Sequence, residues 1–110
     1  MNIQPYRLLC DAGIISTVDQ WQQTISTLPA HRLIVGEEPT TAYAVKTLLV
    51  LGLSAAHGKS DFTIPPSGDE QLTLRLTSYM WEQIQEFQNT YGISNRGAAL
   101  RALLTLGASA

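Results

Sequence analysis

Alternating apolar and polar residues predict one short strand in the second half of the chain. Three leucines alternate with three polar residues, in the order Gln71, Leu72, Thr73, Leu74, Arg75 and Leu76. A period of two places the leucines on one face of a strand and the polar side chains on the other. We therefore expect a strand over about 70–76 with one buried face and one exposed face.

Two helices are expected after this strand. Thr77 and Ser78 are candidate N-caps, and the residues that follow place apolar side chains at helical spacing over about 78–90. Gly92 is typical of the residue that ends an α-helix with a left-handed backbone conformation. Ser94 or Asn95 can cap a second helix rich in alanine and leucine, which completes the order strand, helix, turn, helix.

The first half of the chain gives a less distinct pattern. Residues 17–28 have helical spacing, with Pro29 as a stop, and 31–36 form a β-favouring run. A long apolar helix is expected from Thr40 or Thr41 to about Ala55. Prolines, serines and glycines over 57–68 predict a linker. The expected division is therefore 1–56 as a helical assembly region, 57–68 as the linker and 69–110 as the strand-helix-helix unit.

The two halves align without gaps at an offset of 55 residues. Residues 44–55 match 99–110 and share the run Leu-Leu-x-Leu-Gly-x-Ser-Ala. This match indicates either a divergent internal repeat or the coincidence of two apolar helices. A true repeat would let a first-half strand, 6–10 or 32–35, pair with 70–76 inside one chain. Otherwise the second strand comes from another copy.

Composition and charge narrow the function classes. Hydrophobic residues make up 45% of the 110 residues and charged residues 15%, so a folded chain is expected. The net charge of −2 gives no global attraction to a polyanion, which counts against DNA binding. One cysteine, Cys10, and the absence of a leader pattern favour the cytoplasm. The most apolar stretch, 42–56, is too short to span a membrane.

Neither a metal site nor an active site is expected. His31 and His57 are far apart in sequence, and with Cys10 they match no metal-ligand spacing. The chain has no phosphate-binding glycine loop, no zinc-hydrolase helix motif and no nucleophile with a matching base. We therefore expect no cofactor, no metal and no enzymatic activity.

The polar face of the expected strand is the candidate functional surface. A two-stranded ribbon fits the major groove of DNA, where arginine can bind guanine, glutamine can bind adenine, and threonine can contact either. Gln71, Thr73 and Arg75 are thus candidate base contacts. The start of the second helix favours an anion, so Ser94, Asn95 and Arg96 are candidate phosphate contacts.

Each of these assignments has a simpler alternative. The strand's polar face can be an ordinary solvated face, and residues 94–96 an ordinary helix start. Arg101 is expected to form a solvent-facing pair rather than a DNA contact, and is not assigned to the site. Trp81, Phe87 and Trp21 are expected in the core.

The order of motifs in the second half resembles the ribbon-helix-helix family of Arc- and MetJ-type regulators. The resemblance covers about 40 of 110 residues: Leu72-Thr73-Leu74-Arg75-Leu76-Thr77, Met80-Trp81, Gly92-Ile93-Ser94 and Ala98 to Leu103. It implies a mainly α fold with short β, in which strands from two copies pair into an antiparallel ribbon that reads bases. Departures are Gly97 early in the second helix and the acidic residues Asp69, Glu70, Glu82 and Glu86.

The resemblance implies a partner and a function. We expect a dimer or higher homo-oligomer that binds double-stranded DNA in a sequence-specific way, as a transcriptional regulator such as a repressor, or as a plasmid-maintenance or DNA-processing accessory factor. The alternative is a protein-interaction module that keeps the dimer fold without strong DNA binding. Residues 1–56 would then offer a surface to a protein partner.

Overall fold

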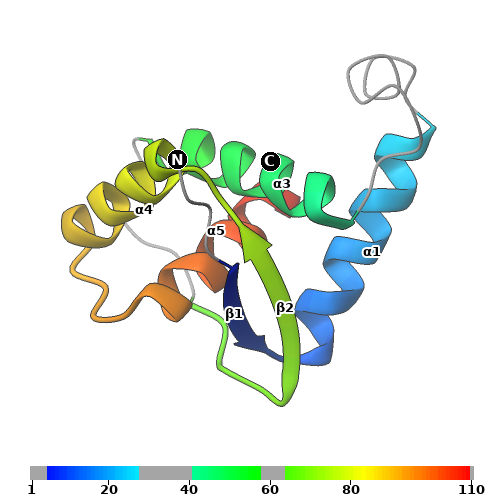
Figure 1. Ribbon diagram of the computed structural model, residues 1–110, viewed down its shortest axis with the longest axis horizontal. Helices are drawn as coiled ribbons and strands as arrows, with labels where there is room; N and C mark the ends of the chain where they lie inside the picture. Colours follow the sequence, from blue (N-terminus) through cyan, green and yellow to red (C-terminus); the bar gives the residue numbers. More distant parts are fainter. Residues whose placement is uncertain (1–4, 28–40, 58–63, 110) are drawn as a thin grey trace.

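The fold is mainly helical with a two-stranded antiparallel sheet. The computed structural model describes residues 5–27, 41–57 and 64–109. Within these ranges the elements, in chain order, are β1 (Pro5–Cys10), α1 (Ala12–Ser26), α3 (Thr41–Ala56), β2 (Glu70–Arg75), α4 (Ser78–Thr90) and α5 (Arg96–Ser109). The sheet lies between α4 and α1, while α3 and α5 cross between them (Figure 1).

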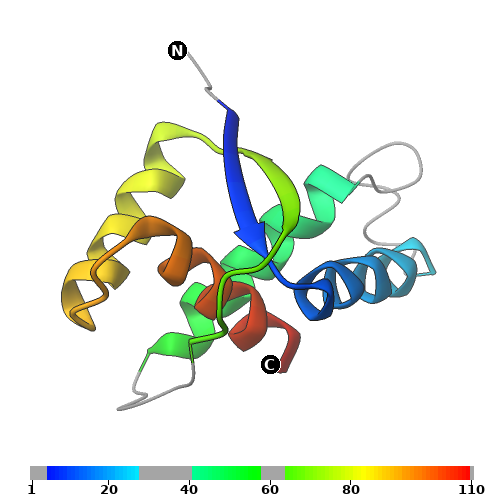
Figure 2. The ribbon, with the colours of Figure 1, turned by 90° about the horizontal axis from the view of Figure 1, so that it is seen from below.

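The two strands come from opposite halves of one chain. β1 pairs antiparallel with β2, with Arg7 opposite Thr73 at the centre and Pro5 opposite Arg75 at one end. Of the two alternatives for the strand that pairs with β2, a second copy or the first half of the same chain, the structure has the second. Of the two candidates, 6–10 is the one used, and 32–35 lies outside the described residues. Figure 2 shows this pairing from below.

Burial alternates along both strands of this ribbon. The inward side chains are Leu8, Cys10, Leu72 and Leu74, all buried. Arg7, Leu9, Gln71, Thr73 and Arg75 are exposed. The alternation predicted for 70–76 is thus confirmed, and the same alternation holds for β1. The ribbon has one face in the hydrophobic core and one face in solvent.

Helices α1 and α4 begin in the same way after their strands. The N-cap Asp11 accepts a hydrogen bond from the amide of Ile14, and the N-cap Thr77 accepts one from the amide of Met80. Both caps have extended backbone, as N-caps require. The boundaries predicted for α4 are confirmed. α1 begins at Ala12, earlier than the expected residue 17, because Asp11 caps it.

Helices α3 and α5 cross at two glycines. A Cβ built on Gly52 would overlap the carbonyl oxygen of Leu103, and one on Gly107 would overlap that of Leu48. The two contacts are reciprocal: Gly52 and Gly107 are 55 positions apart in the sequence, and so are Leu48 and Leu103. Residues matched by the sequence alignment thus hold matching places at the crossing. Such close approach requires glycine on both sides.

One hydrophobic core joins both halves of the chain. Its buried residues come from every described helix and strand, with Leu48, Leu49, Leu103 and Leu104 fully buried. Of the expected core aromatics, Phe87 is buried, while Trp21 and Trp81 are half-buried and packed against the core. Among the helices in the described ranges, none has both the length and the apolar character needed to cross a membrane.

Candidate nucleic-acid interface

The exposed face of the ribbon gathers the candidate base contacts. Gln71, Thr73 and Arg75 all project from β2 into solvent. Their cross-strand neighbours bring two further exposed residues, since Arg7 lies opposite Thr73 and Leu9 opposite Gln71. Side chains directly opposite each other on antiparallel strands lie close together. The three predicted residues therefore belong to one surface that also includes Arg7 and Leu9.

Arg7 and Leu9 were missed by the sequence assignment. The segment 6–10 was one of two candidate strands. Arg7 stands between Tyr6 and Leu8, and this alternation could have placed a basic residue on the polar face of that strand. Leu9 hides this signal because it puts an apolar residue where alternation expects a polar one. Its side chain is 46% exposed. The surface thus has two arginines rather than one.

The candidate phosphate contacts lie at the start of α5. Asn95 is the N-cap, and its side-chain oxygen accepts a hydrogen bond from the amide of Ala98 at 2.8 Å. Ser94 and Arg96 are exposed beside it. Gly92, with φ of 64°, makes the left-handed turn that lets α5 follow α4, as predicted. Of the two candidate caps, Asn95 is therefore the one used.

Arg96 connects this helix start to the ribbon. Its guanidinium carbon lies 4.6 Å from the ring centre of Trp81 and 5.7 Å from that of Tyr6. The two rings themselves meet edge to face, with centres 5.6 Å apart. Such cation–π contacts restrict a side chain that remains exposed. The charge of Arg96 is thus held near the end of the ribbon where Tyr6 pairs with Leu74.

Asn95→Ala is expected to lower the free energy of unfolding by about 1 kcal/mol, because it removes the cap of α5. Ser94→Ala is the matched control, since Ser94 is exposed and next in sequence. It should change stability by less than about 0.5 kcal/mol. Thermal or urea denaturation of both variants measures the difference. Equal effects of the two substitutions would contradict the assignment of Asn95 as the cap.

Arg101 is buried, contrary to the expectation of a solvent-facing side chain. It is 9% exposed, and its Nε donates to the carbonyl oxygen of Pro65 at 2.9 Å. Its Nη1 donates to the carbonyl oxygen of Leu9 at 3.2 Å. The sequence assignment failed here because these acceptors come from segments far away along the chain. Through these two hydrogen bonds Arg101 connects β1 to the segment that precedes β2.

The single cysteine lies on the inner face of the ribbon. Burial raises the pKa of the Cys10 thiol, and the nearby charges of Asp11 and Glu70 raise it further, while Arg101 lowers it. The neutral thiol is therefore favoured, and a buried neutral thiol is a poor nucleophile and metal ligand. Within the described ranges no three histidine, cysteine or acidic side chains come together as a metal site. His31 lies outside those ranges.

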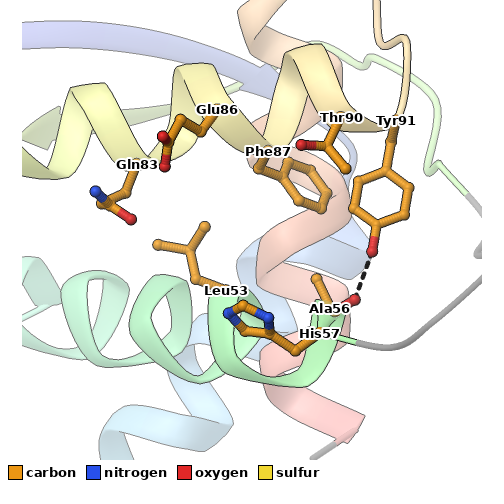
Figure 3. Close-up of a pocket in the computed structure, with 8 residues that line it drawn as sticks. All are labelled: Leu53, Ala56, His57, Gln83, Glu86, Phe87, Thr90 and Tyr91. Carbon is orange, nitrogen blue, oxygen red and sulfur yellow. Dashed lines mark hydrogen bonds between the residues drawn. The ribbon is translucent and has the colours of Figure 1, made fainter.

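Two of the hollows among the described residues lie away from the ribbon. The first, of about 180 Å³, separates the end of α3 from α4 and has His57 and Glu86 among its lining residues (Figure 3). The hydroxyl of Tyr91 closes one side by donating to the carbonyl oxygen of Ala56. The second, of about 330 Å³, is an apolar groove formed by Trp21 of α1 with residues of α3, including Val50. Sequence patterns indicated neither hollow.

The architecture and the surface together define a class: a helix-rich protein with an antiparallel ribbon whose exposed face carries two arginines, Arg7 and Arg75. Comparison with protein-family models, with curated proteins and with solved structures finds no match.

Proposed function

We propose that this chain binds double-stranded DNA by placing the β1–β2 ribbon in the major groove, in a ribbon-helix-helix arrangement completed within one chain. Each half supplies a strand followed by two helices. The proposal keeps the DNA-binding role that the sequence predicts and replaces the second copy with the first half. Such binding would suit a transcriptional regulator or a DNA-processing accessory factor.

The observation that carries the proposal is the exposed face of the ribbon. It presents Arg7, Arg75, Gln71 and Thr73 on two paired strands whose opposite face is buried. A two-stranded ribbon has the width that the major groove admits, and these side chains suit hydrogen bonding to base edges. The second supporting feature is Arg96, whose guanidinium is held over Tyr6 and Trp81 near one end of the ribbon. We expect it to contact a phosphate beside the groove.

The test is fluorescence-polarisation titration of labelled random-sequence duplex DNA at low and moderate salt, with sedimentation to count the chains bound. We expect affinity to fall steeply with salt, since binding to phosphates releases counterions. Arg7→Ala and Arg75→Ala should each weaken binding at low salt by about fivefold, because each removes one positive charge from the binding face.

Lys46→Ala is the matched control. It removes the same charge from the half-buried side of α3, beside Trp21 and away from the exposed ribbon face. Its affinity for DNA should stay within about twofold of the unmodified chain. A folded protein that binds no duplex at low salt, or that loses as much affinity through Lys46→Ala as through Arg75→Ala, would overturn the proposal.

The second candidate function is protein interaction through residues 1–56. The observation that favours it is the apolar groove between α1 and α3, where Val50 is 55% exposed. Apolar surface that stays exposed can serve as a contact surface for another protein. The acidic net charge is also compatible with it. Absence of DNA binding in the titration would make this function the one to pursue.

A further inference from the structure

The two strands of the ribbon present different side chains to solvent. The register places Arg7 opposite Thr73 at the centre, Leu9 opposite Gln71 on one side and Pro5 opposite Arg75 on the other. Two identical strands paired around a two-fold axis at the centre would make the flanking pairs equal. Here the flanking pairs differ, and even the central pair joins an arginine to a threonine. The exposed face is therefore directional.

Charge follows the same direction along the ribbon. At one end lies Arg75, and next to it in register Tyr6 supports the guanidinium of Arg96. At the other end Cys10 pairs with Glu70, which follows Asp69 and is exposed like it. The phosphates of a DNA duplex attract the end with the two arginines and repel the end with the two acidic residues. Because phosphates are evenly spaced along a duplex, this charge difference makes the protein surface directional, while the orientation of the duplex depends on its bases.

The chemistry of base recognition also differs between the ends. Arginine bonds bidentately to guanine in the major groove, and Arg75 near one end and Arg7 at the centre of the face provide two such groups. Glutamine bonds bidentately to adenine, and an apolar side chain contacts the methyl group of thymine. Gln71 and Leu9, paired across the strands, provide these two contacts side by side. The two ends thus prefer different base pairs.

We propose that one chain reads a non-palindromic duplex site in a single orientation, with guanine under Arg7 and Arg75 and an A·T pair under Leu9 and Gln71. This inference rests on the proposed DNA-binding function and adds the polarity of the target. A ribbon of two identical strands would instead favour a palindromic site, because the symmetry of the protein would be repeated in the DNA.

The experiment is selection of binding sequences from a randomised duplex library by the full chain, followed by titration of the enriched duplex. We expect a motif that differs from its own reverse complement, bound by one chain. Exchanging adenine and thymine at the A·T end, with the guanine end unchanged, should weaken binding about tenfold. A palindromic motif would overturn the inference, as would enrichment of no motif from a library that the chain does bind.

Failure of the two proposals can be told apart. Absence of salt-sensitive binding to random duplex refutes the proposed function itself. Salt-sensitive binding together with a palindromic motif, or with no motif, leaves the DNA-binding function standing and refutes only the inferred polarity of the target.

A paired variant tests the cause of the polarity. Residues of β1 and β2 that are 66 positions apart correspond, so position 7 corresponds to Thr73 and position 9 to Arg75. Arg7→Thr combined with Leu9→Arg therefore gives β1 the same side chains as β2 at these two positions. Guanine should then replace the A·T preference at that end, and the motif should become more palindromic. An unchanged motif in the folded variant would contradict the inference.

A single substitution keeps the test decisive if the paired variant fails to fold. Arg75→Ala lies on the exposed face and should relax base preference at the guanine end by about tenfold while leaving the A·T end unchanged. Circular dichroism confirms that the variant is folded before selection. Equal relaxation at both ends of the motif would overturn the assignment of different bases to the two ends of the ribbon.

Discussion

Gly52→Ala is expected to lower the free energy of unfolding by about 3 kcal/mol, and Gly107→Ala by a similar amount, because each added methyl meets backbone of the facing helix. The Cβ of residue 52 would lie 2.8 Å from the carbonyl carbon of Leu103, and that of residue 107 would lie 3.0 Å from that of Leu48. Backbone cannot rotate away as a side chain can, so α3 and α5 must separate.

The sign of this effect makes it informative. In an isolated helix, alanine is favoured over glycine by about 1 kcal/mol, so propensity alone predicts stabilisation. Urea denaturation of both variants measures the change. Ser54→Ala is the control, because Ser54 is exposed on the same helix; it should change stability by less than about 0.5 kcal/mol. Stabilisation by either glycine substitution would show that the helices do not cross as described.

Arg101→Ala is expected to lower the free energy of unfolding by about 3 kcal/mol, since it leaves the carbonyl groups of Pro65 and Leu9 without their charged donor and opens space in the core. Both hydrogen bonds join segments that are distant in sequence. Hydrogen exchange should therefore quicken at β1 and β2 more than in α4, where no such bond is lost.

Lys46→Ala provides the control for Arg101 as well. Position 46 corresponds to 101 in the alignment of the two halves, and Lys46 is half-buried. Its substitution should lower stability by less than about 1 kcal/mol. Equal losses at positions 46 and 101 would contradict the specific role of the Arg101 hydrogen bonds. Arg101→Lys should recover only part of the stability, because lysine has no planar fork to span two acceptors.

Local rules predicted the second half of the chain well. Alternation located β2, the caps at Thr77 and Asn95 located the starts of α4 and α5, and Gly92 marked the turn between them. Each signal acts within a few residues, through side-chain period or through a hydrogen bond to the nearest amides. The burial of Leu72, Leu74 and Leu76 follows from the same alternation.

The pairing of the halves could not be settled from local patterns. At the glycine crossing, equivalent residues are 55 apart, whereas the caps Asp11 and Thr77 are 66 apart. The change of offset falls between α1 and α3, so the ungapped alignment of the helices did not carry over to the strands. Leu9 further obscured the alternation of β1. Arg7 was therefore missed, although its strand was one of two candidates.

Arg101 shows a different limit of sequence reasoning. Its neighbours on α5 are alanines and leucines, and a basic residue among them was expected to reach solvent. The structure instead provides two backbone carbonyl acceptors, from Pro65 and Leu9. Backbone acceptors carry no residue-type signal, so no pattern of side chains could have indicated them.

The joining of β1 and β2 within one chain changes how the ribbon depends on concentration. In an assembly whose ribbon needs strands from two separate molecules, dilution dissociates the partners and the folded state is lost with them. Here the connection between β1 and β2 keeps the strands at a fixed effective concentration, whatever the amount of protein. The pairing of β1 with β2 therefore does not depend on how many copies of this chain a cell contains.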